Sequence, residues 1–291
     1  MRRLCLGLIL ALVVPIGAWA QRTPPIFVKV FTATSKPSLQ PSVAIDLIKA
    51  TGGGYGFHII SGGARAFSFD GRAFLTKSFP RLGSDTVWEA DAKVIGSAYP
   101  ATVDAWVVAI YDTSSNWSVR TVSASASGNS PYARATLPAG YVMTGGGAST
   151  TWKGDGNYLI GNSPDTNQSW QAASKSELYP DSSSSVTAYV IGIKPTDDKA
   201  PLPSSILVSA WSKTPDEAPQ MSVMPDRQGY TIVGGGAVDY WSGAGNMLTA
   251  SYPTSSKLQS WSGAGGDLVW AKTPAIIAVY GIALTNVHML P

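Results

Sequence analysis

Three copies of one glycine-rich segment recur along the chain and constrain its fold more than any other feature. They read "GYGFHIISGGARAFSFDGRAFLTKSFP" from Gly54, "GYVMTGGGASTTWKGDGNYLIGNSP" from Gly140 and "GYTIVGGGAVDYWSGAGNMLTASYP" from Gly229. Their second residues, Tyr55, Tyr141 and Tyr230, are 86 and 89 residues apart. A spacing this regular indicates a structural unit that is repeated three times.

The repeated unit extends to both sides of the glycine-rich segment. A strand-like run precedes it in each copy: "FVKVFTATS", "WSVRTVSAS" and "ILVSAWSKT". A tryptophan follows it (Trp88, Trp170 and Trp261), and an apolar run closes the unit: "VDAWVVAIYD", "VTAYVIGIK" and "IAVYGIALT". We therefore predict three β repeats, at 21–112, 113–200 and 201–291.

The pattern within each repeat predicts an all-β fold. Apolar and polar residues alternate with period two, and short apolar runs are bounded by Gly, Pro, Ser and Asp. We expect five or six antiparallel strands per repeat and no long helix; the nearest helical candidate, 42–50, aligns with a strand-like segment of the second repeat. The repeats could form three separate sandwiches or one body with pseudo-threefold symmetry. We favour the single body, because closure protects sheet edges that small separate units would leave bare.

The first twenty residues have the features of a secretory signal peptide. Two arginines precede an apolar run, and Ala18-Trp19-Ala20 matches a cleavage pattern, so we expect cleavage near Ala20 and an extracellular or periplasmic protein. No later apolar run is long enough to suggest a transmembrane segment. After Cys5 the sequence contains no cysteine, so an exported chain would have to be stabilised by its core without disulfides.

Charge and motif content exclude several functional classes. Only 13% of the residues are charged, and without Arg2 and Arg3 the chain has 19 basic against 18 acidic residues. This balance argues against nucleic acid as a partner. The two histidines, His58 and His288, do not recur between repeats, and no metalloprotease or serine-hydrolase motif is present. We therefore expect no metal site and no cofactor.

The order of glycines, "SYP" or "NSP", tryptophan and "TAYxIG" resembles a β-module of bacterial secreted and surface proteins, in which cysteines often flank the glycine triplet. The resemblance covers all three repeats and implies a β-rich extracellular module without a characterised activity. The composition also bears a distant resemblance to repeat lectins of the β-prism type, whose repeats are shorter.

The glycine triplets, 145–147 and 234–236, do not form a phosphate-binding loop. Such a loop needs a lysine with Ser or Thr and a following helix, and neither is present here. A β-bulge or a close approach of two backbones explains the glycines better. The first repeat keeps only Gly62 and Gly63, with Ser61 in the first place.

The turn that follows the glycines is the candidate binding site. Each copy places an aromatic residue before a tight turn with Asx side chains, a combination that suits a sugar, because a flat ring stacks on the pyranose face while amides and carboxylates bind hydroxyls. The alternative is that the turn residues serve only to form hairpin turns and that the aromatic residues belong to the core. The candidate ligand-binding residues are Trp152, Asp155 and Asn157, then Trp241 and Asn246, then Phe67, Asp70 and Arg72.

Two other functions stay open at this point. A polysaccharide hydrolase or lyase could use a carboxylate pair, for example Asp70 with Glu89 or Asp91, or Asp155 with Glu177 or Asp181. A structural protein of the extracellular matrix would need no such residues. We prefer the hypothesis of a non-catalytic, lectin-like protein that binds a glycan or a cell-surface ligand. The sequence does not indicate its oligomeric state.

Overall fold

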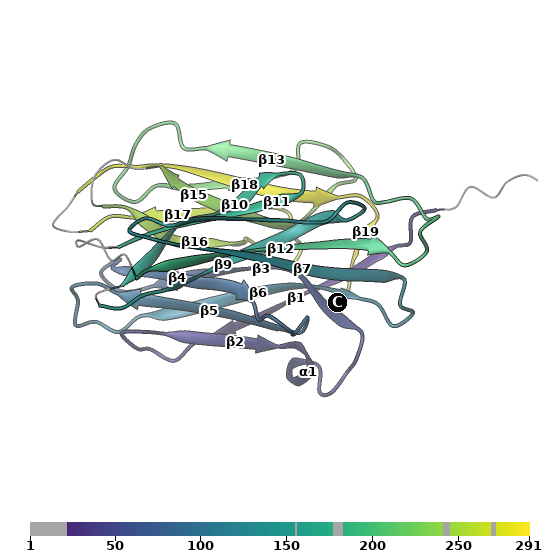
Figure 1. Cartoon of the computed structure of the whole chain (residues 1–291), viewed down its shortest axis with the longest axis horizontal. Helices are drawn as coiled ribbons and strands as arrows, with labels where there is room; N and C mark the ends of the chain where they lie inside the picture. The colour runs from purple at the N-terminus through teal and green to yellow at the C-terminus, as the bar shows by residue number, and fades with distance from the viewer. Residues whose placement is uncertain (1–21, 155, 177–182, 241–244, 269–271) are drawn as a thin grey trace, which may run out of the picture.

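The computed structural model describes residues 22–154, 156–176, 183–240, 245–268 and 272–291. The expected signal peptide, 1–20, lies outside the described residues. Within those ranges the chain forms strands almost throughout, and the strands run along the long axis of the molecule (Figure 1). The predicted all-β class is confirmed.

Each predicted repeat contributes six strands, and the third adds a short one at its end. The stretch 21–112 contains β1 (Ile26–Thr34), β2 (Ser42–Asp46), α1 (Leu47–Ala50), β3 (Phe57–Phe67), β4 (Ala73–Pro80), β5 (Val87–Val94) and β6 (Thr102–Tyr111). The stretch 113–200 contains β7 (Trp117–Ser127), β8 (Tyr132–Thr136), β9 (Val142–Thr151), β10 (Asn157–Thr166), β11 (Ser169–Ser176) and β12 (Ser185–Pro195). The stretch 201–291 contains β13 (Ser205–Trp211), β14 (Gln220–Val223), β15 (Thr231–Tyr240), β16 (Met247–Pro253), β17 (Trp261–Gly266), β18 (Ile276–Leu284) and β19 (Val287–Met289).

The helical candidate at 42–50 is half strand and half helix. Its first five residues form β2, and the last four form the single turn α1. The side chain of Asp46 accepts a hydrogen bond from the backbone N–H of Ile48 and caps this turn.

The strands assemble into three sheets, each shared by two repeats. Sheet I has the order β14-β17-β16-β3-β6-β1-β19, sheet II the order β2-β5-β4-β9-β12-β7, and sheet III the order β13-β18-β15-β10-β11-β8. Every repeat gives its second, fifth and fourth strands to one sheet and its third, sixth and first strands to another. The second and third repeats meet in sheet III, the first and second in sheet II, and the third and first in sheet I. Each repeat therefore shares one sheet with each of the other two repeats, as expected for one body with pseudo-threefold symmetry.

The three joints between repeats have the same register. Two residue pairs join β3 to β16, two join β9 to β4, and two join β15 to β10. Each joint begins at the alanine that follows the glycines: Ala64 pairs with Ser251, Ala148 with Ser78, and Ala237 with Asn162. The glycines therefore lie at the interfaces between repeats.

The first glycine position lies at the centre of the body. A side-chain carbon added at Gly145 would lie 2.6 Å from the β-carbon of Ser61, and one added at Gly234 would lie 2.6 Å from the Ser61 hydroxyl. The three positions therefore share room for one small side chain, which explains why the first repeat carries serine here and the others carry glycine.

The second and third glycine positions have different neighbours. A β-carbon at Gly62 would lie 2.6 Å from the indole of Trp88 and 2.7 Å from the carbonyl oxygen of Trp106. A β-carbon at Gly147 would lie 2.7 Å from the α-carbon of Phe79, on the neighbouring repeat. The triplet therefore serves close packing, first against the buried indole and then against the next backbone.

The repeated tryptophans Trp88, Trp170 and Trp261 form the core, with no exposed surface. The indole N–H of Trp170 donates to Asn162 Oδ1 at 2.7 Å, and that of Trp261 donates to Ser251 Oγ at 3.0 Å. These bonds satisfy polar atoms that burial would otherwise penalise.

Candidate functional site on the outer face of sheet III

Two residues of the sequence-predicted site, Asn157 and Asn246, are completely buried. The amide of Asn157 donates to the carbonyl oxygen of Ser185 at 3.0 Å, and that of Asn246 donates to backbone carbonyls that include Glu217 at 3.3 Å. Asn246 adopts a left-handed conformation, with φ of 56°. Both amides hold neighbouring loops in place, so we do not include them in the site.

The strands that follow the three turns begin at one hydrophobic cluster. Phe74, Tyr158 and Met247, which stand six residues before the matching prolines Pro80, Pro164 and Pro253, belong to this buried cluster. The ring of Phe74 meets that of Tyr158 edge-on, with centroids 6.1 Å apart. The beginnings of β4, β10 and β16 therefore meet in packed side chains.

The remaining described residues of the predicted site do not belong to this cluster. The ammonium of Lys93 lies 5.8 Å from the ring centroid of the half-buried Trp152. Arg72 donates to the carbonyl oxygen of Gly96 at 2.6 Å and lies 3.8 Å from Asp70, while Phe67 is largely exposed. Asp155 and Trp241 lie outside the described residues.

A more open arrangement of aromatic residues lies on the outer face of sheet III. Trp211 on β13 and Tyr240 on β15 stack with ring centroids 5.0 Å apart and planes 17° apart. Their exposed fractions are 48% and 44%, so the pair presents a broad apolar surface to solvent. Tyr280 on β18, the strand between them, and Tyr132 on the edge strand β8 belong to the same face.

The phenol groups on this face are uncharged hydrogen-bonding groups. Burial raises the pKa of Tyr280, and its hydrogen bond with Tyr240 raises it further. Burial also raises the pKa of Tyr132, with a further contribution from the negative charge of Asp165. These two phenols therefore stay protonated at physiological pH and can each donate or accept a hydrogen bond.

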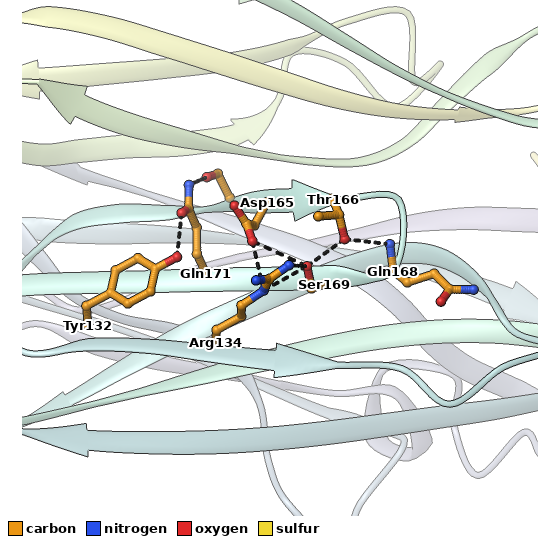
Figure 2. Close-up of polar contacts among 8 residues, drawn as sticks. Tyr132, Arg134, Asp165, Thr166, Gln168, Ser169 and Gln171 are labelled. Atoms are coloured by element: carbon orange, nitrogen blue, oxygen red, sulfur yellow. Dashed lines mark hydrogen bonds and ion pairs between the residues drawn. The ribbon is translucent and has the colours of Figure 1, made fainter.

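An ion pair and its hydrogen bonds border the aromatic residues (Figure 2). Arg134 on β8 pairs with Asp165 on β10 at 2.8 Å, and its guanidinium also donates to Ser169 Oγ at 3.0 Å. Thr166 and Ser169 share a hydrogen bond of 2.6 Å. These contacts fix the charged groups in place and leave no net charge between Arg134 and Asp165.

A second chain of contacts connects this border to the middle of the sheet. The hydroxyl of Tyr132 donates to Gln171 Oε1 at 3.0 Å, and Gln171 Nε2 donates to Ser163 Oγ at 3.0 Å (Figure 2). The amide is therefore held in one orientation, which is a requirement for a preorganised polar contact.

The sixth strand of each repeat carries an aromatic residue: Trp106 on β6, Tyr189 on β12 and Tyr280 on β18. The three sheets differ at the position beside it. In sheet I the ring of Tyr252 stacks on Trp106, with centroids 4.6 Å apart and planes 28° apart. In sheet II the ring of Phe79 packs on Tyr189, with centroids 5.0 Å apart. Register places Ser163 at the matching position in sheet III, because Pro80, Pro164 and Pro253 all pair with the core tryptophans. Tyr280 therefore lacks the aromatic neighbour that Trp106 and Tyr189 have there.

The carboxylates considered for catalysis are mostly engaged in ion pairs. Asp91 pairs with Lys77 at 2.7 Å and Glu89 with Arg81 at 2.6 Å, while Glu177 and Asp181 lie outside the described residues. Within the ranges that the structure describes, no group of three or more His, Cys, Asp or Glu side chains could hold a metal ion.

One buried acid has a strongly altered environment. Burial raises the pKa of Asp239 on β15 to about 7, against the opposing effect of Lys175, and burial lowers the pKa of Lys175 to about 8. Asp239 is only 1% exposed and faces the interior, opposite to Tyr240, its neighbour in the chain. It therefore does not contact a ligand on the outer face.

The sequence interpretation missed Trp211, Tyr240 and Tyr280 as one group. They come from three strands that the fold places side by side, and the sequence pattern around Trp211 indicates only a strand. One signal was present in the sequence: "NSP" at 162–164 replaces the aromatic residue of "SFP" and "SYP".

Comparisons with known proteins give no functional assignment. No family model matches the chain, and no curated protein matches it. A solved structure described as "The Triple Jelly Roll Fold and Turret Assembly in an Archaeal Virus" is 10% identical, covering 93% of this chain and 92% of its own, with a TM-score of 0.17. That value is too low to indicate a shared fold. In the described part of the chain, none of the helices has the length and apolar character needed to span a bilayer.

Proposed function

We propose that this protein is an exported, non-catalytic carbohydrate-binding protein whose principal site is the outer face of sheet III. The observation that carries the proposal is the half-exposed stack of Trp211 and Tyr240. In the other two sheets a ring of the protein packs on the sixth-strand aromatic residue, whereas in sheet III the matching residue is Ser163, which is buried and hydrogen-bonded to Gln171. The C–H face of a pyranose ring would stack on the exposed rings of Trp211 and Tyr240.

The surroundings of Tyr280 suit a sugar in both polarity and charge. Trp211 and Tyr240 provide an exposed apolar surface for the C–H face of a sugar ring. Gln171, Tyr132 and the ion pair of Arg134 with Asp165 provide oriented donors and acceptors for hydroxyl groups. Rigid aromatic residues beside adaptable polar ones are typical of surfaces that bind polar ligands with little loss of conformational entropy.

Binding to a panel of insoluble polysaccharides and to a glycan array tests this function. We expect the wild-type protein to bind at least one glycan and Trp211→Ala to weaken that binding roughly tenfold, since losing a stacking contact of about 1.4 kcal/mol changes affinity by that factor.

Trp152→Ala is the matched control, because it removes an indole from the turn region and leaves sheet III unchanged. Equal binding by wild type and Trp211→Ala, or a loss only in Trp152→Ala, would place the site elsewhere. Release of reducing ends from the bound glycan would contradict the non-catalytic assignment.

A further inference from the structure

A groove on the outer face of sheet I is a separate feature from the site on sheet III. Two adjoining cavities of about 500 and 340 Å³ share Ala66, Gln220, Thr249 and Ala264 among their lining residues, so they form one continuous depression. It crosses strands β3, β16, β17 and β14. Tyr252 lines one part of it and the exposed Phe67 the other.

Small side chains make this groove possible. Ala250 and Ala264 lie on its floor, where register gives the matching positions of sheet II to Lys77 and Asp91. In sheet II those two residues form an ion pair at 2.7 Å and occupy the corresponding space. The same fold therefore presents a filled surface in sheet II and a hollow in sheet I.

The wall of the groove contains a fixed guanidinium. Arg65 donates to Asp104 Oδ2 at 2.7 Å from Nη2 and at 3.3 Å from Nε. Its central carbon lies 5.7 Å from the ring centroid of Trp106 and 5.4 Å from that of Tyr252. The carboxylate and the two rings hold Arg65 in place, and Asp104 balances its charge.

The rest of the lining is polar and uncharged. Gln220, Ser222 and Ser262 contribute an amide and two hydroxyl groups, and the two serine hydroxyls are hydrogen-bonded to each other. A neutral ligand with many hydroxyl groups fits this combination better than an anionic one, because Asp104 already neutralises Arg65, the one cation among the described residues of the lining. The open, elongated form suits a single chain.

We infer that the groove of sheet I is a second carbohydrate-binding site, which holds one neutral polysaccharide chain between Tyr252 and Phe67. This inference rests on the proposed function and adds a second site with a different shape. An extended stacking surface on sheet III and a groove on sheet I would let one molecule hold two chains or two segments of the same chain.

Isothermal titration of the exported chain with cellohexaose, xylohexaose and mannohexaose tests the inference. We expect two sites per molecule for at least one of these sugars. The double variant Ala250→Lys/Ala264→Asp, which copies the ion pair of sheet II into the groove, is expected to bind one. Tyr252→Ala serves as a second variant outside the buried core, and roughly tenfold weaker binding at one of the two sites is expected from the lost ring.

The outcomes separate the two proposals. If the wild type binds one sugar and Trp211→Ala abolishes that binding, or if both groove variants still bind two with unchanged affinity, the groove inference is wrong and the sheet III site stands. If the groove variants abolish all binding while Trp211→Ala has no effect, the groove stands and the sheet III proposal falls. Absence of binding of all three sugars to the wild type, together with a negative polysaccharide panel, overturns both.

Discussion

Removal of residues 201–291 is expected to abolish cooperative folding of the remaining chain. Sheet I would lose β14, β17, β16 and β19, and sheet III would lose β13, β18 and β15, so the first two repeats would keep only sheet II complete. Strands β3 and β10 would become open edges, and the core beside Ser61 and Gly145 would be exposed to water. Open edges of this kind promote aggregation.

Calorimetry and near-ultraviolet circular dichroism measure this effect. The chain 21–291 should show one cooperative transition, and the fragment 21–200 should show none. A shorter deletion, 287–291, is the control: it removes β19, which pairs only with β1, and should preserve the transition. A native-like, cooperative transition of the fragment would mean that the repeats fold independently.

Gly146→Ala is expected to destabilise the protein by about 3 kcal/mol or more, which is the upper range for overpacking of a core. The added carbon would collide with the indole of Trp170, whose Cε3 would be 2.6 Å away, and with the carbonyl oxygen of Tyr189. Trp170 is completely buried and hydrogen-bonded, so it has no room to move.

Gly161→Ala is the matched control for this substitution. Gly161 is also a buried strand glycine, but a β-carbon there would have its nearest neighbour, Ala173 Cβ, at an ordinary contact distance of 3.4 Å. Chemical denaturation should show a change below about 1 kcal/mol. If both substitutions cost the same free energy of unfolding, close packing is not the role of the triplet.

The sequence predicts the all-β class and the structural role of the glycines, because both depend on local patterns. Alternation with period two identifies strands, and a triplet without lysine or a following helix leaves only a backbone role. The pairing of strands between repeats is not a local property. It depends on which strand edges of the three repeats are complementary in the folded chain, and no local sequence pattern identifies those edges.

The candidate site illustrates a different limit. A turn with an asparagine beside a glycine has the same sequence whether its amide binds a ligand or a backbone carbonyl. The sequence therefore predicts Asn157 and Asn246 at a surface, whereas the fold buries both. The sheet III face depends on Trp211, Tyr240 and Tyr280, which are brought together by the fold. Ser163 becomes informative only when its neighbours in space are compared with those of Phe79 and Tyr252.

The most direct test of the function is the affinity of the double variant Trp211→Ala/Tyr240→Ala for the glycan that the wild type binds. Both rings are half exposed and stack on each other, so the variant removes the proposed sugar-stacking surface and leaves the buried core intact. We predict at least tenfold weaker binding at the sheet III site, in line with the loss of about 1.4 kcal/mol. Unchanged affinity in a correctly folded double variant would contradict the proposal that the exposed rings of Trp211 and Tyr240 bind a sugar.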